Sequence, residues 1–127
     1  MTDFVNSFLN QIVFDLRNPA PDRNLGVPIQ PEVNIIKVYY PISHSNEIAS
    51  ASQTYRLAKP ITVKQLLDSI YLFYNQPLTK ENIQAYLHYP GYSPSIKVLR
   101  DVLGGKIIVN NLTAYKDGYL VNLSSVV

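Results

Sequence analysis

The chain lacks cysteine and tryptophan, and its 127 residues include one methionine and two histidines. The absence of thiols excludes disulfides, thiolate metal sites and cysteine nucleophiles. The two imidazoles, His44 and His88, are accompanied by no carboxylate pair at ligand spacing, which is too little for a metal site. We therefore expect neither a bound metal nor a cofactor.

An excess of charge of one sign is also missing. Eleven Lys and Arg stand against nine Asp and Glu, so the net charge is +2 and the field is too weak to identify a partner. No apolar run approaches the roughly 18 residues that a membrane span needs, and the N-terminus lacks the features of a signal peptide. These absences predict an intracellular protein without a membrane span.

What the chain does have is enough apolar material for one core. A length of 127 residues is typical of a single domain, and 46% apolar residues is ordinary for a globular chain. Residues 1–18 form the first segment, where apolar residues recur at three- and four-residue spacing from 4 to 16 and predict an amphipathic helix. That pattern leaves open whether the helix packs on its own domain or on another chain.

A proline-rich connector is predicted over residues 19–32, because prolines cannot continue the helix. Residues 33–127 then form a single α/β domain. Its first strand is predicted at Val33–Tyr40, where β-branched and aromatic residues alternate with others. A polar loop is predicted over 43–52, and a second strand over 54–59.

Capping residues mark the helices. Thr62 and Gln65 have the spacing of a capping box, and Pro77 ends the helix that begins there. Two shorter helices are predicted over 79–89 and 93–103, each preceded by a capping residue.

Asp117–Gly118 is the favoured pair for a two-residue hairpin turn near the C-terminus. A turn at this pair aligns Ala114 with Val121 and Leu112 with Leu123. The fold class predicted from these elements is α+β, a single domain with a small, mostly antiparallel sheet, a C-terminal β-hairpin and three or four short helices packed against it.

Several stretches carry a resemblance to a known family: Pro60–Leu67, Ile70–Tyr71, Pro77–Thr79 and Asp101–Gly104, followed by Val109 and Leu112. Together they resemble a domain of unknown function that is widespread in basidiomycete fungi, with similar uncharacterised proteins in large DNA viruses of amoebae. The likeness spans about residues 55–125, although the family pattern has Phe at position 109 and Gly at position 111. It implies an α/β domain and, for a viral source, a place in the virion or viral factory. It implies no catalytic or binding residue.

Catalytic candidates are few. Ser43-His44-Ser45 is the one place where a nucleophile and a base adjoin, and no glycine-flanked serine accompanies it. His88 lies among aromatic residues at a predicted helix end, where it could bind a ligand. A small hydrolase or transferase that uses His44 or His88 is therefore one alternative, and no catalytic residue is assigned.

Tyrosine is the abundant residue. Five of the ten tyrosines fall between residues 71 and 92, and tyrosine suits half-buried protein interfaces. Few cations lie nearby, so a nucleic-acid binder is the less favoured alternative. We predict a non-enzymatic protein-binding or assembly module whose partner is another protein or a second copy of the chain. The predicted interface comprises Tyr71, Tyr74, Tyr86, His88, Tyr89 and Tyr92.

Overall fold

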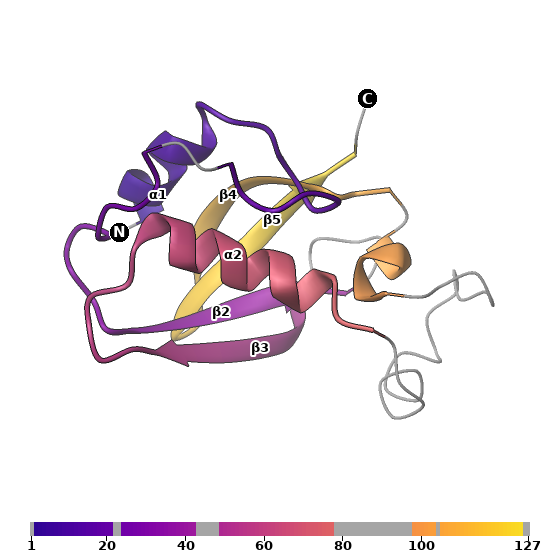
Figure 1. The fold of residues 1–127 in the computed structure, drawn as a ribbon. Helices are drawn as coiled ribbons and strands as arrows, with labels where there is room; N and C mark the ends of the chain where they lie inside the picture. Colours follow the sequence, from indigo (N-terminus) through magenta and orange to yellow (C-terminus); the bar gives the residue numbers. More distant parts are fainter. Residues whose placement is uncertain (1, 22–23, 43–48, 78–97, 104, 126–127) are drawn as a thin grey trace.

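The fold is built around one five-stranded sheet (Figure 1). The computed structural model describes residues 2–21, 24–42, 49–77, 98–103 and 105–125. In chain order the elements are helix α1 (Thr2–Leu9), strands β1 (Phe14–Asp15), β2 (Ile35–Pro41) and β3 (Ala49–Arg56), helix α2 (Val63–Tyr74), the 3₁₀ helix η1 (Leu99–Leu103), and strands β4 (Ile108–Tyr115) and β5 (Gly118–Ser124).

The strand order is β1-β4-β5-β2-β3, with β1 and β3 at the two edges. β2 pairs with β5 in parallel, while the other three neighbouring pairs are antiparallel. The fold class α+β is confirmed, but the prediction of a mostly antiparallel sheet is wrong, because the sheet is mixed. Parallel neighbours need a long crossover, here the chain from β3 through β4, and the alternation within a strand carries no information about such long-range pairing.

The N-terminal helix packs on its own domain, since Val5 and Leu9 belong to the same buried cluster as the residues of the sheet. It is shorter than predicted. Phe14 and Leu16 are buried whereas Val13 is 74% exposed, which is the alternation of a strand, and Phe14–Asp15 forms β1 beside β4. The helix was predicted too long because the apolar residues of this strand lie at positions that also fit the helical spacing.

Asn6 joins α1 to the sheet. Its side-chain nitrogen donates to the carbonyl of Leu112 at 2.9 Å, and its side-chain oxygen accepts from the N–H of Leu112 at 2.8 Å. Because β1 is two residues long, this stretch of β4 has no strand on that side among the described residues. The asparagine amide replaces the missing strand and satisfies both backbone groups.

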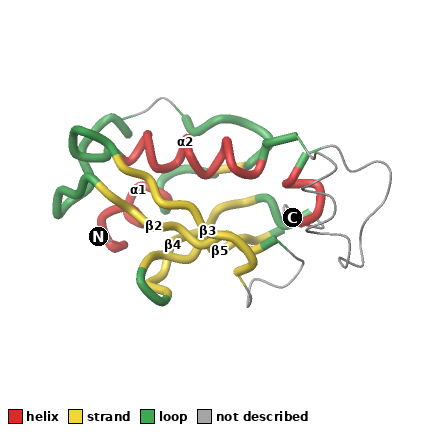
Figure 2. Tube along the Cα trace, turned by 90° about the horizontal axis from the view of Figure 1, so that it is seen from below, coloured by secondary structure: helices red, strands yellow, loops and turns green. Residues whose placement is uncertain are grey.

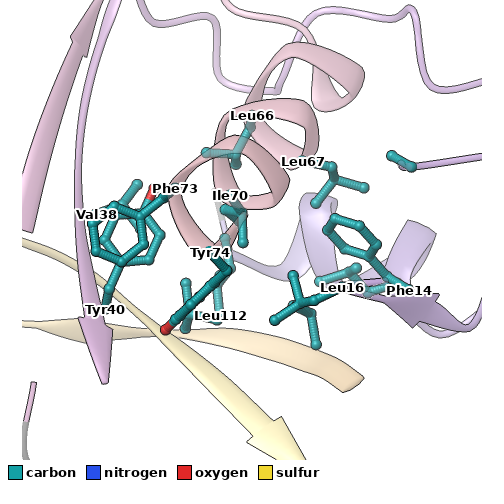
Figure 3. Close-up of a cluster of buried hydrophobic side chains, with 14 of the residues drawn as sticks. Phe14, Leu16, Val38, Tyr40, Leu66, Leu67, Ile70, Phe73, Tyr74 and Leu112 are labelled. Atoms are coloured by element: carbon teal, nitrogen blue, oxygen red, sulfur yellow. The ribbon is translucent and has the colours of Figure 1, made fainter. Parts of the chain in front are cut away.

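Helix α2 begins where the capping box predicts. The N–H of Gln65 donates to the Thr62 hydroxyl at 3.1 Å, and the Gln65 side chain accepts from the N–H of Thr62 at 2.9 Å. Figure 2 shows α2 on one side of the sheet. Its apolar face enters the core, where it meets Tyr40 of β2, Leu112 of β4 and the β1 region (Figure 3).

The other predicted elements need correction. Residues 49–52 are part of β3 rather than of the polar loop, and that strand ends at Arg56, three residues before the predicted end. Leu99–Leu103 is a 3₁₀ helix instead of the end of a longer α-helix. The described ranges contain two α-helices besides this 3₁₀ helix, whereas three or four short helices were predicted for the whole chain. Residues 43–48 and 78–97, which include the predicted helix 79–89, lie outside them.

The C-terminal hairpin is present, but its register differs from the prediction. Tyr115 pairs with Gly118, so the two turn residues are Lys116 and Asp117. Ala114 therefore pairs with Tyr119 instead of Val121, and Leu112 pairs with Val121 instead of Leu123. Lys116 adopts the positive φ, 51°, that the turn requires.

Gly118 is needed inside the strand because β2 approaches it closely. A Cβ atom at Gly118 would lie 2.3 Å from the carbonyl oxygen of Lys37. Only glycine leaves room for that backbone, which is why it stands in β5 rather than in the turn.

We expect Gly118→Ala to lower the free energy of unfolding by about 1–3 kcal/mol, because β2 and β5 must separate to admit the methyl group. Gly26→Ala is the matched control, since no atom lies within 4 Å of the added Cβ. Urea denaturation measures both. Equal stabilities of the two variants would show that β2 does not approach Gly118 as described.

Candidate functional site

The structure places Tyr74 in the core rather than on the surface. Its side chain is 0% exposed, and its hydroxyl donates to the carbonyl of Pro41 at 2.7 Å. The Tyr74 ring fills the space between α2 and β2, so Tyr74 adds no exposed surface to an interface in this fold. Tyr71 is half-buried and packs against the same core.

The remaining predicted residues lie outside the described part of the chain. These are the interface candidates Tyr86, His88, Tyr89 and Tyr92 and the catalytic candidate His44. What was expected of them stays a prediction.

A groove runs between α2 and β3. It consists of two adjoining hollows of about 230 and 290 Å³, which share Tyr55, Ser69 and Leu72. The first hollow is otherwise lined by Ile36, Leu57, Ile61, Gln65, Leu66 and Asp68. The second is otherwise lined by Gln53, Phe73 and Gln76. We call the two together the α2–β3 groove.

Hydroxyl groups between the two hollows are already hydrogen-bonded. The Tyr55 hydroxyl lies 2.9 Å from the Tyr40 hydroxyl and 3.2 Å from the carbonyl of Ser69, and it also contacts the Gln53 side-chain oxygen. The Ser69 hydroxyl donates to the carbonyl of Leu66 at 2.6 Å. These hydroxyls hold the groove together, and none has the neighbouring base that a nucleophile needs.

Tyr40 fixes α2 against the sheet. Its ring stacks on Phe73 with centroids 3.8 Å apart and planes at 15°, and it meets Tyr74 edge to face at 5.5 Å. Burial, and then the neighbouring Tyr55, raise the pKa of the Tyr40 hydroxyl above its ordinary value. Because Tyr55 has carbonyl acceptors for its own proton, Tyr40 is the donor in the bond between the two hydroxyls.

The outer edge of β3 is free of any strand in the described ranges. The N–H of Leu57 donates to the carbonyl of Asn34 at 2.9 Å, so residues at odd positions of β3 bond to β2. In an antiparallel pair the intervening residues direct their backbone groups the other way. The N–H and C=O groups of Ser52, Thr54 and Arg56 therefore point away from β2 and pair with no strand among the described residues, and all three residues are exposed.

Exposed apolar side chains border this edge. Leu72 is 66% exposed and Leu57 is 39% exposed, and both line the groove. Around them, Lys64 pairs with Asp68 at 3.2 Å, whereas Arg56 and Lys59 have no ion-pair partner among the described residues. The surroundings of the groove are thus weakly cationic.

A second aromatic cluster lies on the opposite face of the sheet, and its rings contact one another and nearby lysines. Tyr39 and Tyr115 meet edge to face at 5.0 Å. The ammonium of Lys37 lies 5.2 Å from the Tyr39 ring centre, and that of Lys116 lies 5.3 Å from the Tyr115 ring centre. Hydrogen bonds from Tyr39 and then Lys37 lower the pKa of Asp117. The rings and charged groups of this cluster therefore interact with one another.

No matching family model, curated protein or solved structure was found for this chain. Within the described residues, no three His, Cys, Asp or Glu side chains group in a way that could hold a metal ion. None of the described helices combines the length and the apolar character that crossing a membrane takes.

The groove residues were missed by the sequence analysis. Along the helix that follows the capping box, Leu66, Ile70 and Tyr74 are spaced as one apolar stripe, whereas Leu72 falls outside it on the otherwise polar side. A leucine off the buried stripe of an amphipathic helix was the available signal.

The raised pKa of Tyr40 makes stability depend on alkaline pH. The folded state keeps this proton above pH 10, where the unfolded chain releases it, so the free energy of unfolding falls as the pH rises further. One proton corresponds to about 1.4 kcal/mol per pH unit. We expect urea denaturation at pH 9 to 11 (about one unit either side of 10) to give a shallower loss for Tyr40→Phe than for the wild type. Identical slopes would contradict the burial of an un-ionised Tyr40.

Proposed function

We propose that this chain is a non-enzymatic protein-binding module whose contact surface is the α2–β3 groove together with the free edge of β3. The observation that carries the proposal is the coincidence of the two features. An apolar groove and backbone groups that pair with no strand in the described part of the chain lie along the same strand. Extended segments bind such edges through backbone hydrogen bonds, while alternate side chains enter neighbouring pockets.

The spacing of the groove supports an extended ligand. Gln53 and Tyr55 of β3, and Leu57 just after its end, follow one another on the groove side, and same-face side chains repeat every 6.7 Å or so along a strand (about 2 × 3.3–3.4 Å). Tyr55 separates the two hollows. A bound strand would place an apolar side chain in the hollow lined by Leu57 and Ile61, and a polar side chain two residues away beside Gln53 and Gln76.

A nucleic-acid partner has weaker support. The aromatic rings that accompany lysines, Tyr39 and Tyr115, have ammonium groups over their faces, and Asp117 offsets part of the local charge. Base stacking needs free ring faces beside a cationic path for the phosphates. The hydrolase or transferase alternative rests on His44 and His88 alone.

The cellular location of the protein and its family relationship are part of the same proposal. An intracellular location, and kinship with the uncharacterised fungal and viral domain, are compatible with a binding module and rest on the sequence. The tyrosines at 86, 89 and 92, with His88, would extend the contact surface if they reach it.

Leu72→Asp tests the contact surface directly. A phage-displayed library of random linear peptides, selected on the wild-type protein, supplies the ligands, and fluorescence anisotropy gives their affinities. We expect Leu72→Asp to weaken binding at least about tenfold, because a desolvated apolar anchor is replaced by a charge.

Val13→Asp is the matched control, since Val13 is 74% exposed and lines neither hollow of the groove. It should bind the selected peptides as the wild type does. Selected peptides that bind all three proteins equally, or a selection that yields no peptide, would overturn the proposed surface.

A further inference from the structure

We infer that the free edge of β3 pairs with β3 of a second copy of this chain, antiparallel and across a two-fold axis, so that two sheets join into one. This inference rests on the proposed function and names the partner of the same surface. It follows from three features of the described residues: the contrast between the two sheet edges, the pattern of β3 itself, and the position of Leu72.

The two edge strands of the sheet, β1 and β3, differ in length, charge and cover. At one edge, β1 is only two residues long and contains the ion-paired Asp15. Beyond β1, the Asn6 side chain hydrogen-bonds to the backbone of β4. Short edge strands, charges and covering groups are the usual devices against edge-to-edge pairing. β3 is eight residues long and has no proline and no lysine. Its one charge is the terminal Arg56, so this edge is open to another strand.

The pattern of β3 is complementary to itself. In an antiparallel pair centred on Thr54, the outward backbone groups of Ser52, Thr54 and Arg56 all find partners, because Ser52 of each copy meets Arg56 of the other. On the groove side, Gln53 then faces Tyr55. No like charges stand directly opposite one another, which is the arrangement that would oppose pairing.

The groove side gains a hydrophobic contact from the same symmetry. A two-fold axis perpendicular to the joined sheet keeps both copies of α2 on one face. Leu72 projects from α2 toward the β3 side and is 66% exposed in the single chain. The two Leu72 side chains, with Leu57 from each copy, would line the space between the helices. This contact explains why two exposed leucines border the outer edge of β3, which pairs with no strand among the described residues.

Sedimentation velocity over a micromolar to millimolar range tests the inference. We expect the wild type to form a dimer, and Thr54→Lys to raise its dissociation constant at least about tenfold, because two introduced ammonium groups stand opposite each other at the axis. Thr113→Lys is the matched control, since Thr113 is exposed on the interior strand β4. A monomeric wild type at all concentrations, or a dimer that Thr54→Lys leaves unchanged, would overturn the inference.

The absence of cysteine allows a second readout of the register. Thr54→Cys should form an intermolecular disulfide on mild oxidation, because paired strands bring the two Cα atoms to about 5.5 Å, within the range that a disulfide spans. Thr113→Cys should not. A wild type that stays monomeric but binds selected peptides through Leu72 would leave the proposed function standing and remove only the second copy as partner.

Discussion

The stacking of Tyr40 on Phe73 is the contact on which the rest of the arrangement depends, because it holds α2 over β2. A helix with its side chains is about 10 Å wide, whereas five strands span about 19 Å. One helix therefore cannot cover the whole inner face. α1 covers the region of β4, and the side of β3 is left with a groove where more core would otherwise be. The candidate site therefore arises because α2 leaves the β3 side of the inner face uncovered.

Local signals in the sequence predicted local structure well. The capping box at Thr62 and Gln65 forms as expected, and the alternation from Val33 to Tyr40 became β2. Both depend on residues within one turn or one strand. β3 was harder, because an edge strand without a buried outer neighbour tolerates small polar residues, and Ala49–Arg56 resembles a loop in composition. Long-range pairing, such as that of β2 with β5, leaves no mark in either strand.

Gly118 shows why a correct residue gave a wrong register. Its type indicated a turn, and the turn is adjacent, but the reason for glycine is the carbonyl of Lys37, which lies far away in the sequence on β2. The tyrosines present the same difficulty. Abundance cannot separate Tyr74, which is buried, from Tyr55, which lines the groove, because both are amphipathic residues whose place the tertiary fold decides.

The open edge of β3 is the central claim, and amide hydrogen exchange of the dilute, monomeric protein tests it most directly. The N–H groups of Gln53 and Tyr55 should be protected by their bonds to β2, whereas those of Ser52 and Thr54 should exchange at rates close to those of an unstructured chain. Equal protection of all four amides in the monomer would mean that the chain covers this edge itself, and would contradict the account.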